Sequence, residues 1–202
     1  MAKIDIMNTA INLLGEELIN SPTQATKAAS RANKQYDAVR DSVLRSHIWN
    51  FAVKRRQLSA SSTDPVFHWS YAFPLPSDFI RVAHVSDNGY DYIGETGPEW
   101  EINYHEGVRC IMIDSATCYL KYVARVTDEA LFDPLFTEAF ASKLAAEIAY
   151  ALTQDLNLYN SLLGRYQLVL RRAKSIDSQE GNYDRVVDDE WMSSRRVHRP
   201  PR

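Results

Sequence analysis

The spacing of apolar residues changes at residues 44–58, Leu-Arg-Ser-His-Ile-Trp-Asn-Phe-Ala-Val-Lys-Arg-Arg-Gln-Leu, and this change divides the chain into two kinds of structure. Before it, apolar residues recur at three- and four-residue steps, as on one face of a helix. After it, short runs alternate apolar and polar residues, as in strands. We therefore predict that Trp49 and Phe51 pack in the core beneath a helix-to-strand junction, and that Lys54, Arg55 and Arg56 stay exposed beside it.

Two helices are predicted before the junction. The first covers about residues 5–18 and includes Gly15, which either ends the regular helix or admits a close neighbour. We favour close packing. The second begins near residues 23–26 and continues to about residue 47. Charged residues at 37, 40, 41 and 45 form its polar face, which we expect to be solvated, with Asp41 paired to Arg45.

Two more helices are predicted near the end of the chain. Asp133 is suited to cap the third helix, and Pro134 to occupy its first position, where the missing N–H is not needed. This helix should run for roughly 20 residues, and its many alanines place it centrally. The fourth helix covers about residues 157–176.

The middle of the chain is predicted to form about six short strands, arranged as an antiparallel meander or a small barrel-like sandwich. The runs are 66–73, 79–85, 90–93, 100–104, 108–113 and 117–126. Asn88-Gly89 and Glu106-Gly107 lie between runs and suit tight hairpins. The predicted fold class is therefore α+β. An antiparallel bundle of about four helices, formed by residues 1–56 and 129–177, carries a β-rich insertion, residues 57–128, between its second and third helices.

The apolar period disappears in residues 178–202, which we predict to be a flexible C-terminal arm. Acidic residues come first, then Trp191, then the basic residues Arg195, Arg196 and Arg199. Simple disorder is one interpretation. The other is an arm that becomes ordered on a partner, with Trp191 as its anchor.

Composition gives no global argument for a nucleic-acid or anionic-membrane partner, because 23 Lys and Arg residues face 26 Asp and Glu residues. No run approaches the roughly 18 apolar residues of a membrane span, so we expect a soluble protein made in the cytoplasm. The two cysteines, Cys110 and Cys118, fall in a segment interpreted as a hairpin. Reduced thiols on neighbouring strands are expected rather than a disulfide.

No residue pattern indicates catalysis, so neither an enzyme nor a cofactor is expected. The five histidines lack the spacing of a zinc site. Ser77-Asp78 with His68 suggests a hydrolase only weakly, because no nucleophile elbow accompanies them. The basic cluster Lys54-Arg55-Arg56, near two aromatic residues, supports an alternative function as a nucleic-acid-binding accessory protein. Such a cluster is more often a solvated edge or a contact with another subunit.

Five motifs, in their order and spacing, resemble the family of short-tailed phage tubular tail protein A. They are A-x-N-x-L-G at 10–15, Y-D-x-x-R-D-x-x-L at 36–44, W-N-F-A at 49–52 with Arg55 or Arg56 and Leu58, Y-x-F-P-L-P-x-D at 71–78, and Y-V-x-R-V-x-D-x-x-x-F-D-P-L-F at 122–136. An alanine-rich helix follows the last motif. The resemblance covers roughly residues 8–176.

This resemblance implies a structural protein of the virion, the head-to-tail adaptor or gatekeeper. Such an adaptor forms a ring beneath the portal protein and joins it to the tail nozzle protein. The ring is usually a dodecamer, although some adaptors stay monomeric until they meet the portal. Genomic DNA passes through the channel during ejection without specific recognition, and no membrane is contacted. The C-terminal segment tends to dock on the portal, which assigns Trp191, Arg195, Arg196 and Arg199 to that contact by location.

Overall fold

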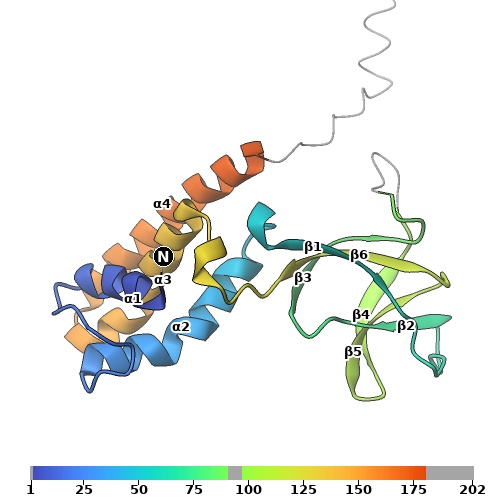
Figure 1. Cartoon of the computed structure of the whole chain (residues 1–202), viewed down its shortest axis with the longest axis horizontal. Helices are drawn as coiled ribbons and strands as arrows, with labels where there is room; N and C mark the ends of the chain where they lie inside the picture. Colours follow the sequence, from blue (N-terminus) through green and yellow to red (C-terminus); the bar gives the residue numbers. More distant parts are fainter. Residues whose placement is uncertain (1, 91–96, 181–202) are drawn as a thin grey trace, which may run out of the picture. The chain divides into compact units, whose positions relative to one another are not determined.

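A computed structural model describes residues 2–90 and 97–180, and it confirms the predicted α+β class (Figure 1). These residues form four α-helices and two three-stranded antiparallel sheets, with all six strands between the second and third helices. The elements are α1 (Lys3–Asn12), α2 (Lys27–Arg45), η1 (Asn50–Ala52), β1 (Val53–Leu58), β2 (Tyr71–Pro74), β3 (Phe79–Ser86), β4 (Trp100–His105), β5 (Val108–Ile113), β6 (Cys118–Ala124), η2 (Glu129–Leu131), α3 (Pro134–Thr153) and α4 (Leu156–Glu180).

The chain divides into two compact units. The described part of the helical unit lies in Met1–Arg55, Pro76–Ala83 and Lys121–Glu180, and that of the β unit lies in Arg56–Leu75 and His84–Leu120. The helical unit thus includes two segments that the sequence places in the β insertion. Both segments lead into or out of strands, so β1, β3 and β6 each begin in one unit and end in the other.

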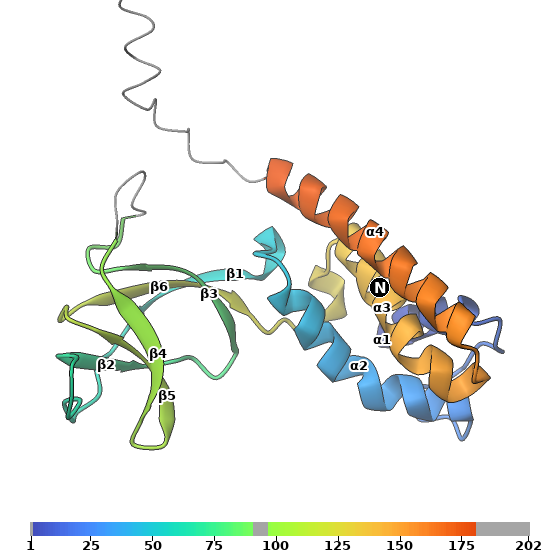
Figure 2. The ribbon, with the colours of Figure 1, turned by 180° about the vertical axis from the view of Figure 1, so that it is seen from behind.

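The alanine-rich α3 is the central element of the helical unit and packs against α1, α2 and α4 (Figure 2). Asp133 caps it through one carboxylate oxygen, which accepts hydrogen bonds from the backbone N–H groups of Leu135 and Phe136 at 2.8 and 3.0 Å. Pro134 occupies its first position, as predicted. Alanines at 139, 141, 145, 146 and 149 are all buried, which lets neighbouring backbones approach closely.

Helix α1 is shorter than predicted, because it ends at Asn12 rather than near residue 18. Gly15 adopts a left-handed backbone with φ of +72°, and a methyl group added there would meet no atom within 4 Å. The prediction of close packing at Gly15 is therefore wrong, and this glycine belongs to the turn that follows the helix. The side chain of Asn8 holds the returning chain by bonding both the N–H and the carbonyl of Ile19.

The polar face of α2 also differs from prediction. Arg40 is buried and bridges Asp37 and Asp41, with 2.8 Å to each carboxylate. Asp41 also pairs with Arg125 at 2.8 Å. Arg45, instead of pairing with Asp41, donates to the backbone carbonyl of Ile80 at 2.6 Å. This face therefore joins α2 to segments far along the chain, whereas the sequence favoured a solvated face.

The strands form two sheets with orders β1-β6-β3 and β2-β5-β4, which is not a simple meander. Strands β4 and β5 form the hairpin expected at Glu106-Gly107, pairing Trp100 with Ile113 and His105 with Val108. The predicted strand at 66–73 is present only from Tyr71 to Pro74. Strand β1 begins at Val53, earlier than the predicted start of β structure. Most of the predicted strand at 90–93 lies outside the described residues.

The two cysteines are free thiols on strands of different sheets, Cys110 on β5 and Cys118 on β6. They are therefore not on neighbouring strands, contrary to prediction. Both are buried, and burial raises the pKa of the Cys118 thiol to about 11. A thiol with so high a pKa carries little reactive thiolate near neutral pH.

Candidate functional site

The junction between α2 and β1 is built around Trp49, whose side chain is fully buried. Its indole Nε1 donates a hydrogen bond to the carbonyl of Val43 at 3.0 Å. The indole meets the ring of Phe136 edge to face, with centroids 5.1 Å apart, and the half-buried Phe51 ring lies 4.9 Å from Phe136. The structure thus places Trp49 in the core of the helical unit and packs the partly buried Phe51 against that core, with the start of α3 on both rings.

A buried carboxylate, Asp177 of α4, ties the end of the helical unit to this junction. It is only 6% exposed, and it accepts a hydrogen bond from the backbone N–H of Asn50 at 3.1 Å. The Nε2 of His47 lies 3.1 Å from its second oxygen. Sequence reasoning missed this group. The signal in the sequence is a charged residue four positions after Ala173, on the face of α4 that is buried.

We predict that the stability of the folded chain depends on pH through His47 at this junction. Burial lowers the pKa of His47 from its ordinary value, and this effect exceeds the opposing attraction of Asp177. The unfolded chain therefore binds a proton at a higher pH than the folded chain does. Stability should be full above pH of about 6.5 and should fall as pH decreases below it.

Urea unfolding of the parent and of His47→Gln between neutral and mildly acidic pH checks this expectation. The glutamine amide can still donate to Asp177 but does not titrate, so the variant should lose less stability on acidification. Equal losses in the two proteins would show that His47 does not contribute.

The predicted interface cluster Lys54-Arg55-Arg56 lies on β1, with all three side chains exposed. Lys54 pairs with Asp78 at 2.7 Å, and the hydroxyl of Tyr122 donates to the other carboxylate oxygen of Asp78 at 3.0 Å. Burial opposes ionisation of Asp78, but these hydrogen bonds outweigh it and lower the pKa of the carboxyl. Asp78 therefore connects β1 and β6 through its side chain.

The other predicted interface residues, Trp191, Arg195, Arg196 and Arg199, lie outside the described residues. The two aromatic junction residues and the basic cluster are adjacent along the chain but differ in environment. Trp49 is buried in the core with Phe51 packed against it, and the cations face solvent.

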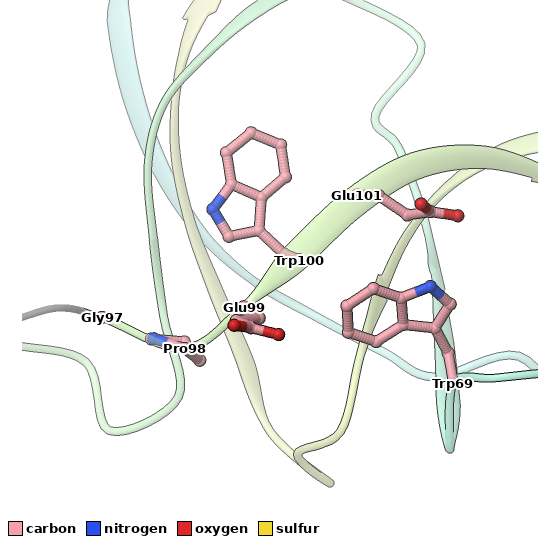
Figure 3. A pocket seen from close by; sticks show the side chains of 6 residues that line it. All are labelled: Trp69, Gly97, Pro98, Glu99, Trp100 and Glu101. Carbon is pink, nitrogen blue, oxygen red and sulfur yellow. The ribbon is translucent and has the colours of Figure 1, made fainter.

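A hollow of about 610 Å³ lies in the β unit at the start of β4 (Figure 3). Its lining residues are Trp69, Gly97, Pro98, Glu99, Trp100 and Glu101. Two indoles and two carboxylates suit a cationic group such as a guanidinium, because aromatic faces and carboxylates both attract positive charge. Sequence reasoning did not select this site, since its residues come from a loop and a strand separated by about thirty positions.

Across residues 2–90 and 97–180, no group of three or more His, Cys, Asp or Glu side chains is placed to hold a metal ion. Within the same ranges, no helix is both long enough and apolar enough to cross a membrane. The exposed cations of β1 and the aromatic-acidic hollow beside β4 are two groups of side chains that could take part in contacts. Comparison of the sequence with protein-family models and with curated proteins finds no match.

Proposed function

We propose that this chain is a non-enzymatic head-to-tail adaptor of a short-tailed phage. The observation that carries the proposal is the ordered set of five motifs between residues 10 and 136, which resembles tubular tail protein A. The arrangement of elements supports it, because a helical unit with a β insertion between α2 and α3 is what that resemblance implies.

Contacts between distant motifs give further support. Asp41 of the second motif pairs with Arg125 of the fifth at 2.8 Å. Asp78 of the fourth accepts from Tyr122 of the fifth at 3.0 Å. Phe51 of the third packs on Phe136 of the fifth, with centroids 4.9 Å apart. Residues of the second, third and fourth motifs thus each contact the fifth.

The proposed role requires partners rather than substrates. The adaptor would bind the portal protein on one side and the tail nozzle protein on the other, and copies of the chain would contact one another in a ring, a dodecamer in the virion. Interfaces of this kind depend on packed surfaces and charged rims. The exposed cations of β1 and the hollow beside β4 supply such groups.

Electron microscopy of the full chain mixed with its cognate portal tests the proposal. We expect a ring of added density on one end of the portal, and no such density when the chain is replaced by an unrelated protein of similar charge. Portal particles that remain bare at high adaptor concentration would overturn the adaptor function.

The proposed C-terminal arm is tested by removing residues 181–202. The deletion begins after Glu180 because α4 extends to that residue and Asp177 supports the junction. A shortened chain should keep the thermal stability of the parent but bind the portal at least about tenfold more weakly, a loss of 1.4 kcal/mol or more. Unchanged portal binding would reject the arm.

The competing function, nucleic-acid binding through Lys54, Arg55 and Arg56, makes a different prediction. A DNA binder should bind strongly at low salt and lose affinity steeply as salt increases. An adaptor with a net charge of -3 should bind DNA weakly at any salt concentration. The observation that Lys54 is already paired with Asp78 favours the adaptor, because it leaves two cations for a phosphate backbone.

A further inference from the structure

We propose that the edge strand β1 of one copy adds antiparallel to the edge strand β4 of a second copy, so that Lys54-Arg55-Arg56 faces Glu99-Trp100-Glu101. The proposal identifies the surfaces through which subunits of the proposed adaptor would join. It depends on the adaptor function in one respect only, the closure of successive contacts into a ring. The pairing itself concerns two copies of this chain alone.

Both strands have an open edge in the described structure. In the order β1-β6-β3, β1 is bonded to β6 alone, and in the order β2-β5-β4, β4 is bonded to β5 alone. Each strand has six residues, and with Arg55 opposite Trp100, residues 53–55 of β1 lie opposite residues 102–100 of β4. An open edge presents a row of backbone N–H and carbonyl groups to which another strand can bond.

The side chains of these edges are exposed on both faces. Residues 54–57 of β1 and residues 100–104 of β4 are all exposed, although successive side chains on a strand point to opposite faces. In β4 the exposed residues include Trp100, Ile102 and Tyr104, which are 39%, 37% and 69% exposed. Trp100 and Ile102 would lie opposite residues 55 and 53 of the partner strand, so both have surface to bury when that strand is added.

The charges of the two edges are complementary in sign and in spacing. An antiparallel pairing that sets Arg55 opposite Trp100 also sets Arg56 opposite Glu99 and Lys54 opposite Glu101. Side chains directly opposite in such a pair have Cβ atoms about 4.5–5.5 Å apart, close enough for ion pairs. The outer two pairs share one face, and Arg55 reaches Trp100 on the other face, where a guanidinium binds an indole well.

Glu99, Trp100 and Glu101 all line the hollow beside β4 (Figure 3). Its carboxylates come from Glu99 and Glu101, and its indoles come from Trp69 and Trp100. Lys54 already has a partner in Asp78, so Arg55 and Arg56 are the cations expected to bring new ion pairs and ring contacts.

The same charges disfavour pairing of like edges. Two β1 strands would set three cations against three cations, and two β4 strands would bring pairs of carboxylates together, which is destabilising when the charges are directly opposite. The favoured contact is therefore between unlike edges. Such a head-to-tail contact leaves one edge of each kind free on every added copy, so it generates a ring when the rotation closes.

Disulfide trapping between two full-length variants tests the pairing. Arg56→Cys and Glu99→Cys copies are mixed under mild oxidation, and formation of the covalent two-chain product is followed by non-reducing electrophoresis. Paired Cα atoms about 4.5–5.5 Å apart lie within disulfide range, so we expect the product to form at least about tenfold faster than with a mismatched pair. The native cysteines are both buried, which keeps background cross-linking low.

The matched control mixes Arg56→Cys with Glu106→Cys, because Glu106 is exposed and lies beyond the opposite end of β4. Trapping captures transient pairing, so a protein that is monomeric on average still gives the product. Equal rates for the two mixtures, or equally fast cross-linking of either cysteine variant with itself, would overturn the proposal.

Charge reversal gives a second, non-covalent test on the protein alone. In sedimentation velocity at low salt, at a concentration where the parent self-associates, reversing Arg55 and Arg56 to Glu, or Glu99 and Glu101 to Arg, should each abolish self-association, and mixing the two variants should restore it. These positions are exposed, so both variants should keep the thermal stability of the parent. Self-association unchanged by both reversals would overturn the pairing. A portal experiment that fails while trapping succeeds would reject the adaptor function and leave the pairing intact.

Discussion

Replacing Trp49 by alanine is expected to lower the free energy of unfolding by about 3–5 kcal/mol, the cost of truncating a fully buried aromatic side chain. The site can collapse little, because the rings of His47, Phe51 and Phe136 surround the indole at centroid distances of 5.0, 6.3 and 5.1 Å. Urea unfolding followed by far-ultraviolet circular dichroism measures the loss.

Two matched variants separate the contributions. Trp49→Phe keeps an aromatic ring but removes the N–H that bonds Val43 at 3.0 Å. The Val43 carbonyl also accepts from Ser46 N and Oγ at 3.1 and 2.7 Å, so it stays satisfied. This variant should cost less than the alanine, on the order of 1–2 kcal/mol.

Trp100→Ala applies the alanine change at a partly exposed tryptophan of the β unit and should cost under about 1 kcal/mol. If Trp49→Ala were as stable as the parent, or no worse than Trp100→Ala, the junction would not depend on the indole.

The helices were predictable because their signals are local. Asp133-Pro134 fixes the start of α3 within two residues, and the buried positions of α2 and α4 recur at three- and four-residue steps. The end of α1 was not predictable in the same way. Leu13, Leu14 and Leu18 continue the apolar pattern, but Leu18 is 59% exposed in the structure, and Gly15 takes a turn conformation instead.

The strands were less predictable because tertiary surroundings decide which apolar residues are buried. Val66 and Phe67 read as strand residues, yet they are 100% and 87% exposed and lie in a loop whose Ser70 is held by Asp114. Strand β1 shows the opposite case. Its Lys-Arg-Arg sequence has no alternation to detect, because an edge strand exposed on both faces has no apolar side.

The contacts that form the junction and the hollow could not be predicted from the sequence, because they join residues that are far apart along the chain. Asn50 and Asp177 are 127 positions apart, and Trp69 and Trp100 come from separate segments. Periodicity shows which face of an element is buried but not what lies against it. A charged residue on an otherwise apolar stripe, such as Asp177 after Val169 and Ala173, is the kind of local signal that points to such a contact.

Replacing Asp177 by alanine should cost about 2–4 kcal/mol, because it leaves the N–H of Asn50 and the ring of His47 without their acceptor in a part-buried place. Far-ultraviolet circular dichroism during urea unfolding measures the change. The loss should appear at the contact between α4 and the junction, so hydrogen exchange of the Asn50 amide should also accelerate.

Asp177→Asn distinguishes the hydrogen bonds from the charge. The amide oxygen can still accept from Asn50, so this variant should keep more stability than Asp177→Ala if the backbone bond dominates. Gln179→Ala is the control for the helix end, since Gln179 is exposed and bonds only Ser175 within its own helix among the described contacts. If Asp177→Ala and Gln179→Ala were equally stable, the buried carboxylate would not join α4 to the junction. In that case the chain could be shortened before Asp177 without harm to the helical unit.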